Sequence, residues 1–408
     1  MKHLLSFRTG FLLIAALIWQ GCRNNEAAAP NPMQYAQPGN EYLVSARLLG
    51  EYTTSQISKR TLVPLPLQYS VRVYKVVYKT RNTDGTSLQA SGSLLVPVTA
   101  NNRIPKGLIS QQHGTITNDA DAPSYYNPGS ESYTFGSALA SLGYAIACPD
   151  YIGYGESKQV PHPYEHRQSL ASSSLDMIRA VHEFFGNNKI TGFEKLFITG
   201  YSEGGFATLS LQKMIEEEFA DDFNLVASSC GAGAYHKSRF MEYLVAQNTP
   251  GNSDFNRSYV YTLLTYNRVY GLNRPTTYYF KEPYAAEVQA RQQDARINVS
   301  LSQAFTTEFK QAVLQPGNEF ARAVADNDVH DWKPETPTRL YHGTADTFVF
   351  YFNSESAYNA MRARGATQVT LVTLPNQDHE SGVAGFALGT YQFFESFIEG
   401  VTRCRKRE

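Results

Sequence analysis

The chain has 408 residues, of which 42% are hydrophobic and 18% are charged, and its formal net charge is −1. This length allows one large domain with an insertion, or two domains, and the composition is that of a globular protein. A charge this close to zero offers no basic surplus for phosphates, so we expect no nucleic-acid partner.

The N-terminal segment predicts export. Two basic residues precede an apolar run at residues 11–19, which is too short to span a bilayer as a mature helix. The Gly-Cys pair that follows resembles the junction of a bacterial lipoprotein signal, in which Cys22 is lipidated. We expect residues 1–21 to be a signal peptide and residues 22–40 to be a flexible tether. The protein would then be a lipid-anchored bacterial membrane lipoprotein, in the outer membrane or at the cell surface, with simple secretion as the alternative.

From Ser70 onward, apolar runs of strand length alternate with helical patterns. The predicted strands are 71–80, 88–98, 107–111, 144–148, 196–199, 225–230, 338–342 and 369–374. The predicted helices of this alternation are 133–142, 168–185, 206–219 and 382–399. Such alternation predicts a mainly parallel sheet with helices on both faces.

Residues 235–333 interrupt the alternation and are dense in aromatic side chains. An unstructured loop of this length is uncommon, so we expect a mostly helical cap inserted into the core. Most of its aromatic residues would pack within the cap, and a minority would face a substrate cleft. The core would consist of residues 41–234 and 334–408.

A G-x-S-x-G pentapeptide, Gly200 to Gly204, joins the strand 196–199 to the helix that follows it. A turn this sharp lifts one side chain out of the sheet, and a Cβ on either flanking glycine would clash with the turn. The lifted residue is Ser202, and a serine becomes nucleophilic when a base takes its proton. The pattern predicts acyl transfer or hydrolysis at Ser202, with an ordinary turn serine as the alternative.

A base and an acid for this serine are expected in loops at the carboxyl edge of the sheet, where ligands gather. His379 lies in the loop after strand 369–374, and Asp346 follows strand 338–342. Asp378 is a rival acid because it is adjacent to His379. Adjacent side chains point in different directions, which favours Asp346 as the group that orients the imidazole.

The chain order serine, acid, histidine is that of one fold. On these residues, the region 70–398 resembles an α/β-hydrolase, and more narrowly the secretory lipase family of bacterial and fungal lipases and esterases. The segments that carry the resemblance are Pro149–Ser157, His162–Tyr164, Gly200–Gly205, His342–Asp346 and Asp378–His379. The resemblance implies an eight-stranded sheet ordered 1-2-4-3-5-6-7-8 and a lid-like insertion before the strand that carries the acid.

An oxyanion on the attacked carbonyl needs prepared donors. The backbone N–H of Glu203, the residue after the nucleophile, is the first candidate. The second is expected in the loop after strand 107–111, from Gly114 or Thr115, and the choice between them stays open.

These features predict an exported serine carboxylester hydrolase that forms an acyl-enzyme on Ser202 and acts on small-molecule or lipid esters. We expect no cofactor, and no metal site, because no histidine or cysteine cluster has metal-ligand spacing. A serine peptidase of the same fold is the nearest alternative. A non-catalytic surface binding protein on a hydrolase scaffold is the alternative from another class.

Overall fold

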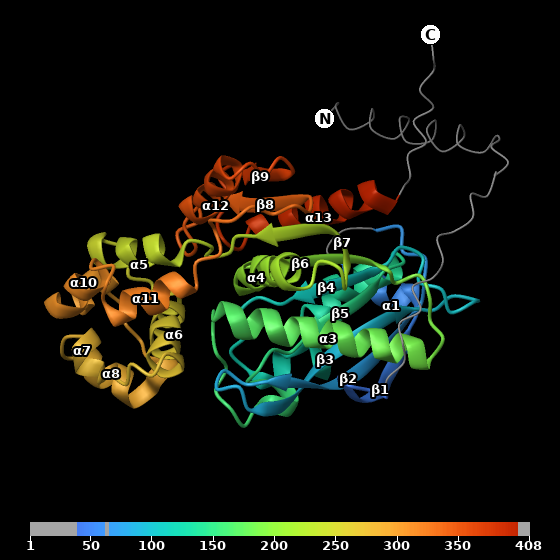
Figure 1. Cartoon of the computed structure of the whole chain (residues 1–408), viewed down its shortest axis with the longest axis horizontal. Helices are drawn as coiled ribbons and strands as arrows, with labels where there is room; N and C mark the ends of the chain where they lie inside the picture. The colour runs from blue at the N-terminus through green and yellow to red at the C-terminus, as the bar shows by residue number, and fades with distance from the viewer. Residues whose placement is uncertain (1–38, 62–64, 399–408) are drawn as a thin grey trace, which may run out of the picture. The chain divides into compact units, whose positions relative to one another are not determined.

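The computed structural model describes residues 39–61 and 65–398 (Figure 1). The predicted signal peptide, the lipidation site Cys22 and nearly all of the predicted tether lie outside these residues. Within the described ranges, no helix is both long and apolar enough to cross a membrane.

A single sheet forms the centre of the fold, and it has nine strands in the part of the chain that the structure describes. The strands are β1 (Leu43–Tyr52), β2 (Val71–Arg81), β3 (Ser87–Pro97), β4 (Leu108–Gln112), β5 (Ala145–Pro149), β6 (Lys195–Tyr201), β7 (Asn224–Gly231), β8 (Thr338–Gly343) and β9 (Val369–Leu374). Their order is β1-β2-β3-β5-β4-β6-β7-β8-β9. The pairs β1–β2, β2–β3 and β3–β5 are antiparallel, and all the other neighbouring pairs are parallel.

The predicted α/β-hydrolase fold is confirmed, with one difference in the sheet. Strands β2 to β9 follow the expected order 1-2-4-3-5-6-7-8, and β1 adds a ninth strand at the edge beside β2. Only Leu43 of β1 is buried, so this strand has no run of apolar residues from which it could be predicted.

Helices cover both faces of the sheet, as Figure 1 shows. One layer contains α3 (Arg167–Asn187), α4 (Glu203–Glu218) and α12 (Phe352–Ala363), and the other contains α1 (Thr54–Ser58), α2 (Ser137–Ser141) and α13 (Gly382–Ile398). Short helical turns lie at Asp119–Asp121, Pro123–Tyr125, Ser132–Gly136, Gly155–Ser157 and Gln292–Asp294. The central strands β4, β5 and most of β6 are fully covered, which explains the continuous apolar run of β5.

The segment between β7 and β8 forms the cap helices, which Figure 1 shows beside the carboxyl end of β7. They are α5 (Lys237–Ala246), α6 (Ser253–Val269), α7 (Thr276–Tyr279), α8 (Tyr284–Arg291), α9 (Leu301–Ala304), α10 (Thr307–Val313) and α11 (Glu319–Asp326). The cap has an apolar core, which includes Tyr259, Tyr266, Tyr279 and Phe280 and is joined by Val349 from the segment after β8. Most of the aromatic residues therefore stabilise the insertion itself, and Tyr261 is one that faces a cleft.

Candidate active site

Ser202 lies at the turn between β6 and α4, with φ +60° and ψ −123°. This backbone conformation is rare for a residue with a side chain, and it persists only where the surroundings enforce it. Here the Ser202 N–H donates to the Gly231 carbonyl at 2.9 Å. A Cβ on Gly200 would lie 2.3 Å from the Gly204 carbonyl, and one on Gly204 would lie 2.2 Å from the Gln112 carbonyl. Both flanking glycines are therefore needed for the turn to pack against its neighbours.

The structure brings His379 and Asp346 together with Ser202, although the three residues come from separate loops. The Nε2 of His379 lies 2.8 Å from Ser202 Oγ, and its Nδ1 lies 2.7 Å from Asp346 Oδ2. The loop that carries His379 is fixed by the Tyr201 hydroxyl, which donates to the His379 carbonyl at 2.8 Å. With Nδ1 protonated, the imidazole donates to Asp346 and accepts the Ser202 proton at Nε2.

Asp346 is surrounded by donors. Its Oδ1 accepts the N–H groups of Phe348 and Val349, both at 2.9 Å. Its Oδ2 faces His379 and also the Nε2 of His342, at 3.3 Å. Burial alone would raise the pKa of Asp346, but the hydrogen bonds and charges of His342 and His379 lower it to about 2. The carboxylate is thus held ionised beside His379.

Asp378 and His342 both lie close in sequence to the proposed histidine and acid, and the structure gives them different partners. Asp378, the rival acid, is turned away and accepts from Ser381 N at 2.8 Å and Ser381 Oγ at 2.6 Å. His342, the last residue of the predicted strand 338–342, is buried, and its Nε2 contacts Asp346. A spacing of four residues between a strand end and a loop does not by itself predict this contact.

The loop after β4 lies beside Ser202, since a Cβ on Gly114 would lie 3.8 Å from the Cβ of Ser202. The Gly114 N–H donates to Glu131 Oε1 at 2.8 Å, so it is already engaged. Burial raises the pKa of Glu131, and the Gly114 N–H acts in the opposite direction. Between the two donors left open by the sequence, this contact favours Thr115 over Gly114.

Glu203 begins α4, so its N–H lies in the first turn, where no intrahelical partner exists and the helix dipole favours negative charge. Its buried side chain points elsewhere, and its Oε1 lies 2.8 Å from His162 Nε2. The other nitrogen of His162 lies 2.6 Å from the Ile152 carbonyl. This bridge explains the place of the His162–Tyr164 segment, since it ties the loop after β5 to the helix that follows Ser202.

A cleft of about 730 Å³ opens next to this loop. It is lined by residues 115–117, by residues in the range 153–162 and by helix α6 of the cap. Tyr261 of α6 stacks on Tyr164 with ring centroids 4.7 Å apart, and the Tyr164 hydroxyl bonds to Thr115 Oγ1 at 2.8 Å. Thr115 therefore belongs both to the wall of the cleft and to the loop beside Ser202.

Comparisons with known proteins agree with this architecture. Residues 130–381, more than half of the chain, match the model of the hydrolase family described as serine aminopeptidase, S33. A search of curated protein sequences finds no match.

Solved structures of similar fold cover 88% of the chain. A protein of Legionella pneumophila, named as a candidate hydrolase, is 26% identical, with 99% of that chain covered and a TM-score of 0.77. The rice cell wall degrading esterase LipA of Xanthomonas oryzae is 26% identical, with 97% of that chain covered and a TM-score of 0.74. Candida antarctica lipase A, in its closed state, shares the fold at 14% identity, with 82% of that chain covered and a TM-score of 0.65.

The matched segment includes Ser202, Asp346 and His379, and it is set in a sheet with the order of the α/β-hydrolases. The resemblance predicted from the motifs is confirmed at the level of the fold, and the chain is a hydrolase that belongs to the serine aminopeptidase S33 family of α/β-hydrolases.

Proposed function

We propose that the protein is an exported serine carboxylester hydrolase. The observation that carries this proposal is the continuous hydrogen-bond chain from Ser202 Oγ through the His379 ring to Asp346. The esterase LipA, at 26% identity over most of both chains, supports an ester as the bond cleaved.

In the proposed reaction, Ser202 Oγ attacks the ester carbonyl while His379 Nε2 accepts the hydroxyl proton. The oxyanion that forms is stabilised by the N–H of Glu203 and, as a second donor, the N–H of Thr115. His379 then gives its proton to the leaving alkoxide, and the acyl group stays on Ser202. Water attacks the acyl-enzyme by the same route, with His379 again accepting and returning the proton. Asp346 holds the imidazole in the productive tautomer throughout.

A serine peptidase is the second candidate, because the description of the matching family names an aminopeptidase. Both activities would use the same acyl-enzyme, so they differ in the leaving group that His379 protonates and in what the cleft accepts. The direct test compares kcat/KM on p-nitrophenyl esters of increasing acyl length with kcat/KM on aminoacyl p-nitroanilides. We expect the esters to be preferred, and a preference for the anilides would replace the esterase assignment with the peptidase one.

Export and lipid anchoring are a separate part of the proposal, and they rest on residues 1–22 of the sequence. Cells fed a labelled fatty acid should incorporate it into the wild-type protein and not into a Cys22→Ser variant. Equal labelling of both proteins, or of neither, would contradict lipidation at Cys22.

A further inference from the structure

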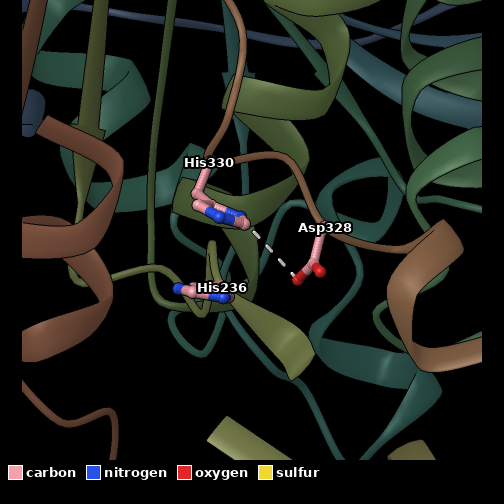
Figure 2. A group of neighbouring side chains, drawn as sticks. All are labelled: His236, Asp328 and His330. Atoms are coloured by element: carbon pink, nitrogen blue, oxygen red, sulfur yellow. Dashed lines mark ion pairs between the residues drawn. The ribbon is translucent and has the colours of Figure 1, made fainter. Parts of the chain in front are cut away.

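A cluster of three polar side chains joins the two ends of the cap, away from Ser202 in the sequence (Figure 2). His236 directly precedes α5, where the cap begins. Asp328 and His330 follow α11, where the cap ends. The cluster therefore connects the segment that leaves β7 with the segment that returns to β8.

The three side chains converge closely. The rings of His236 and His330 are stacked, with centroids 3.6 Å apart and planes at 13°. His330 Nδ1 lies 3.8 Å from Asp328 Oδ1, which is too long for a hydrogen bond. One potential ligand atom from each residue lies within 4.8 Å of the other two.

Two nitrogen atoms of this cluster have no hydrogen-bond partner among the described residues. Among the described residues, the Nδ1 atoms of His236 and His330 are both buried without a hydrogen-bond partner, which is an unfavourable state for a polar atom. Two imidazolium rings stacked this closely would repel each other, so at least one ring keeps a free lone pair. A single proton cannot bridge the nitrogens of both rings and the carboxylate oxygen at these distances. A single metal cation could bind all three atoms at once.

The carboxylate is already oriented for such a role. Asp328 accepts hydrogen bonds from Ser238 N at 3.0 Å and from Ser238 Oγ at 2.6 Å. Each carboxylate oxygen keeps a further lone pair, and one of the two oxygens lies within 4.8 Å of a nitrogen of each ring. Outer contacts such as those from Ser238 fix the ligands of metal sites. All three residues are partly exposed, so an ion could enter from solvent.

We propose that His236, Asp328 and His330 bind one Zn²⁺ ion that clamps the two ends of the cap together. Two imidazole nitrogens and a carboxylate oxygen suit Zn²⁺, and three protein ligands leave the fourth tetrahedral position to water. Ligands at about 2.0–2.1 Å from Zn²⁺ lie about 3.3 Å from one another. Closing the cluster requires the ligand atoms to approach by about 1.5 Å and the two stacked rings to tilt until their planes meet at the ion, by rotation about the side-chain torsions. This site is independent of the proposed ester hydrolysis.

The test uses the folded protein after treatment with a chelator and removal of the chelator. Titration with ZnCl₂ in a calorimeter should give one ion per chain, and Zn²⁺ should raise the melting temperature. His236→Ala and His330→Ala should each weaken binding roughly 100-fold or more, since removal of outer-shell partners alone costs 10–100-fold. Glu319→Gln is the matched control, because this exposed carboxylate of the cap pairs with Arg274 and its loss should leave Zn²⁺ affinity unchanged.

Two further measurements test where the ion binds and how it is coordinated. A His379→Ala variant should keep the same single site, which separates the cluster from binding at the candidate active site. Co²⁺ bound to the wild-type chain should show the visible absorption of a tetrahedral site, and this readout does not depend on whether the alanine variants fold. The proposal is overturned if Zn²⁺ binding is not saturable, or if His330→Ala and His236→Ala bind as tightly as the wild type.

Discussion

The carboxylate of Asp346 accepts hydrogen bonds on both oxygens, from two backbone N–H groups and from the imidazole of His379. These contacts fix the orientation of the carboxylate relative to His379 Nδ1. In the proposed mechanism Asp346 would act on Ser202 through His379, so its effect should be seen in turnover more than in substrate binding.

Replacing Asp346 by asparagine should lower kcat by about 10⁴, because an amide favours the wrong tautomer of His379. KM for a p-nitrophenyl ester should change little. The matched control is Asp378→Asn, which alters the adjacent carboxylate that bonds to Ser381. If Asp378→Asn were the more damaging change, the acid would have been assigned to the wrong residue.

The lowered pKa of Asp346 also predicts how stability depends on pH. Because the folded-state pKa of about 2 lies below the ordinary value of 3.8, the carboxylate stabilises the fold fully above pH 3.8. That contribution, about 2 kcal/mol, is lost as pH falls toward 2. The difference in unfolding free energy between wild type and Asp346→Asn, measured in urea, should shrink by this amount between about pH 5 and pH 2. A difference that is constant over this range would show that Asp346 is not the titrating group.

Sequence reasoning found the residues whose chemistry requires a fixed place at a strand end. Ser202 directly follows β6, and Asp346 and His379 lie in the loops after β8 and β9, so the topology brings all three to one edge of the sheet. Glu131 carried no such signal, because it meets Gly114 through the folding of a long irregular loop. The contact between His342 and Asp346 was not predicted, because it depends on how the loop after β8 folds back onto the strand end.

At the scale of elements, the turn from β6 to α4 depends on close backbone packing against the end of β4. A Cβ at Gly204 would lie 2.2 Å from the Gln112 carbonyl and 2.8 Å from the His113 carbonyl. Neither contact can be relieved by rotating a side chain, so the backbone itself would have to move.

Gly204→Ala should therefore destabilise the protein by about 1–3 kcal/mol in urea unfolding and should also reduce activity, since the loop beside Ser202 moves with it. Gly317→Ala is the control, because no atom lies within 4 Å of the added Cβ. Its effect should stay within about 0.5 kcal/mol. Equal effects of the two substitutions would contradict this packing argument.

Element prediction was accurate where burial imposed an apolar run, as in β5 and in the Leu196–Ile198 part of β6. It missed β1, whose side chains are mostly exposed or half-buried on an edge strand. The helix predicted at residues 133–142 begins as the π-helical turn Ser132–Gly136 before α2, a hydrogen-bonding change that apolar spacing does not reveal.

At the scale of the whole molecule, one buried ion pair joins the cap to the core. Lys237, at the start of α5, pairs with Glu165 in the loop before α3, and both side chains are buried. Burial raises the pKa of Glu165, and the charge of Lys237 opposes that shift. The pair therefore holds the first cap helix against the same loop that carries His162.

Lys237→Met should cost about 3–5 kcal/mol, because it leaves Glu165 buried without its partner. The double variant Lys237→Met with Glu165→Gln should cost less than the single lysine variant. Urea unfolding of the two single variants and the double variant completes the cycle. Additive costs would mean that the two side chains are not coupled.

The arrangement of the cap was the least predictable part of the molecule. Its aromatic density predicted an inserted body but not which ring faces the cleft, and stacking of Tyr261 on Tyr164 joins segments far apart in the chain. His236 and His330 likewise meet only because the cap closes on itself, so no local spacing pointed to their cluster.

The central claim is that Ser202 is the nucleophile, and covalent labelling tests it most directly. The folded protein is treated with a fluorophosphonate probe, and the modified residue is identified by tandem mass spectrometry. The account predicts one modified residue, Ser202, with labelling abolished in Ser202→Ala and strongly slowed in His379→Ala. Failure of the wild type to react, or labelling that persists on another serine in Ser202→Ala, would contradict it.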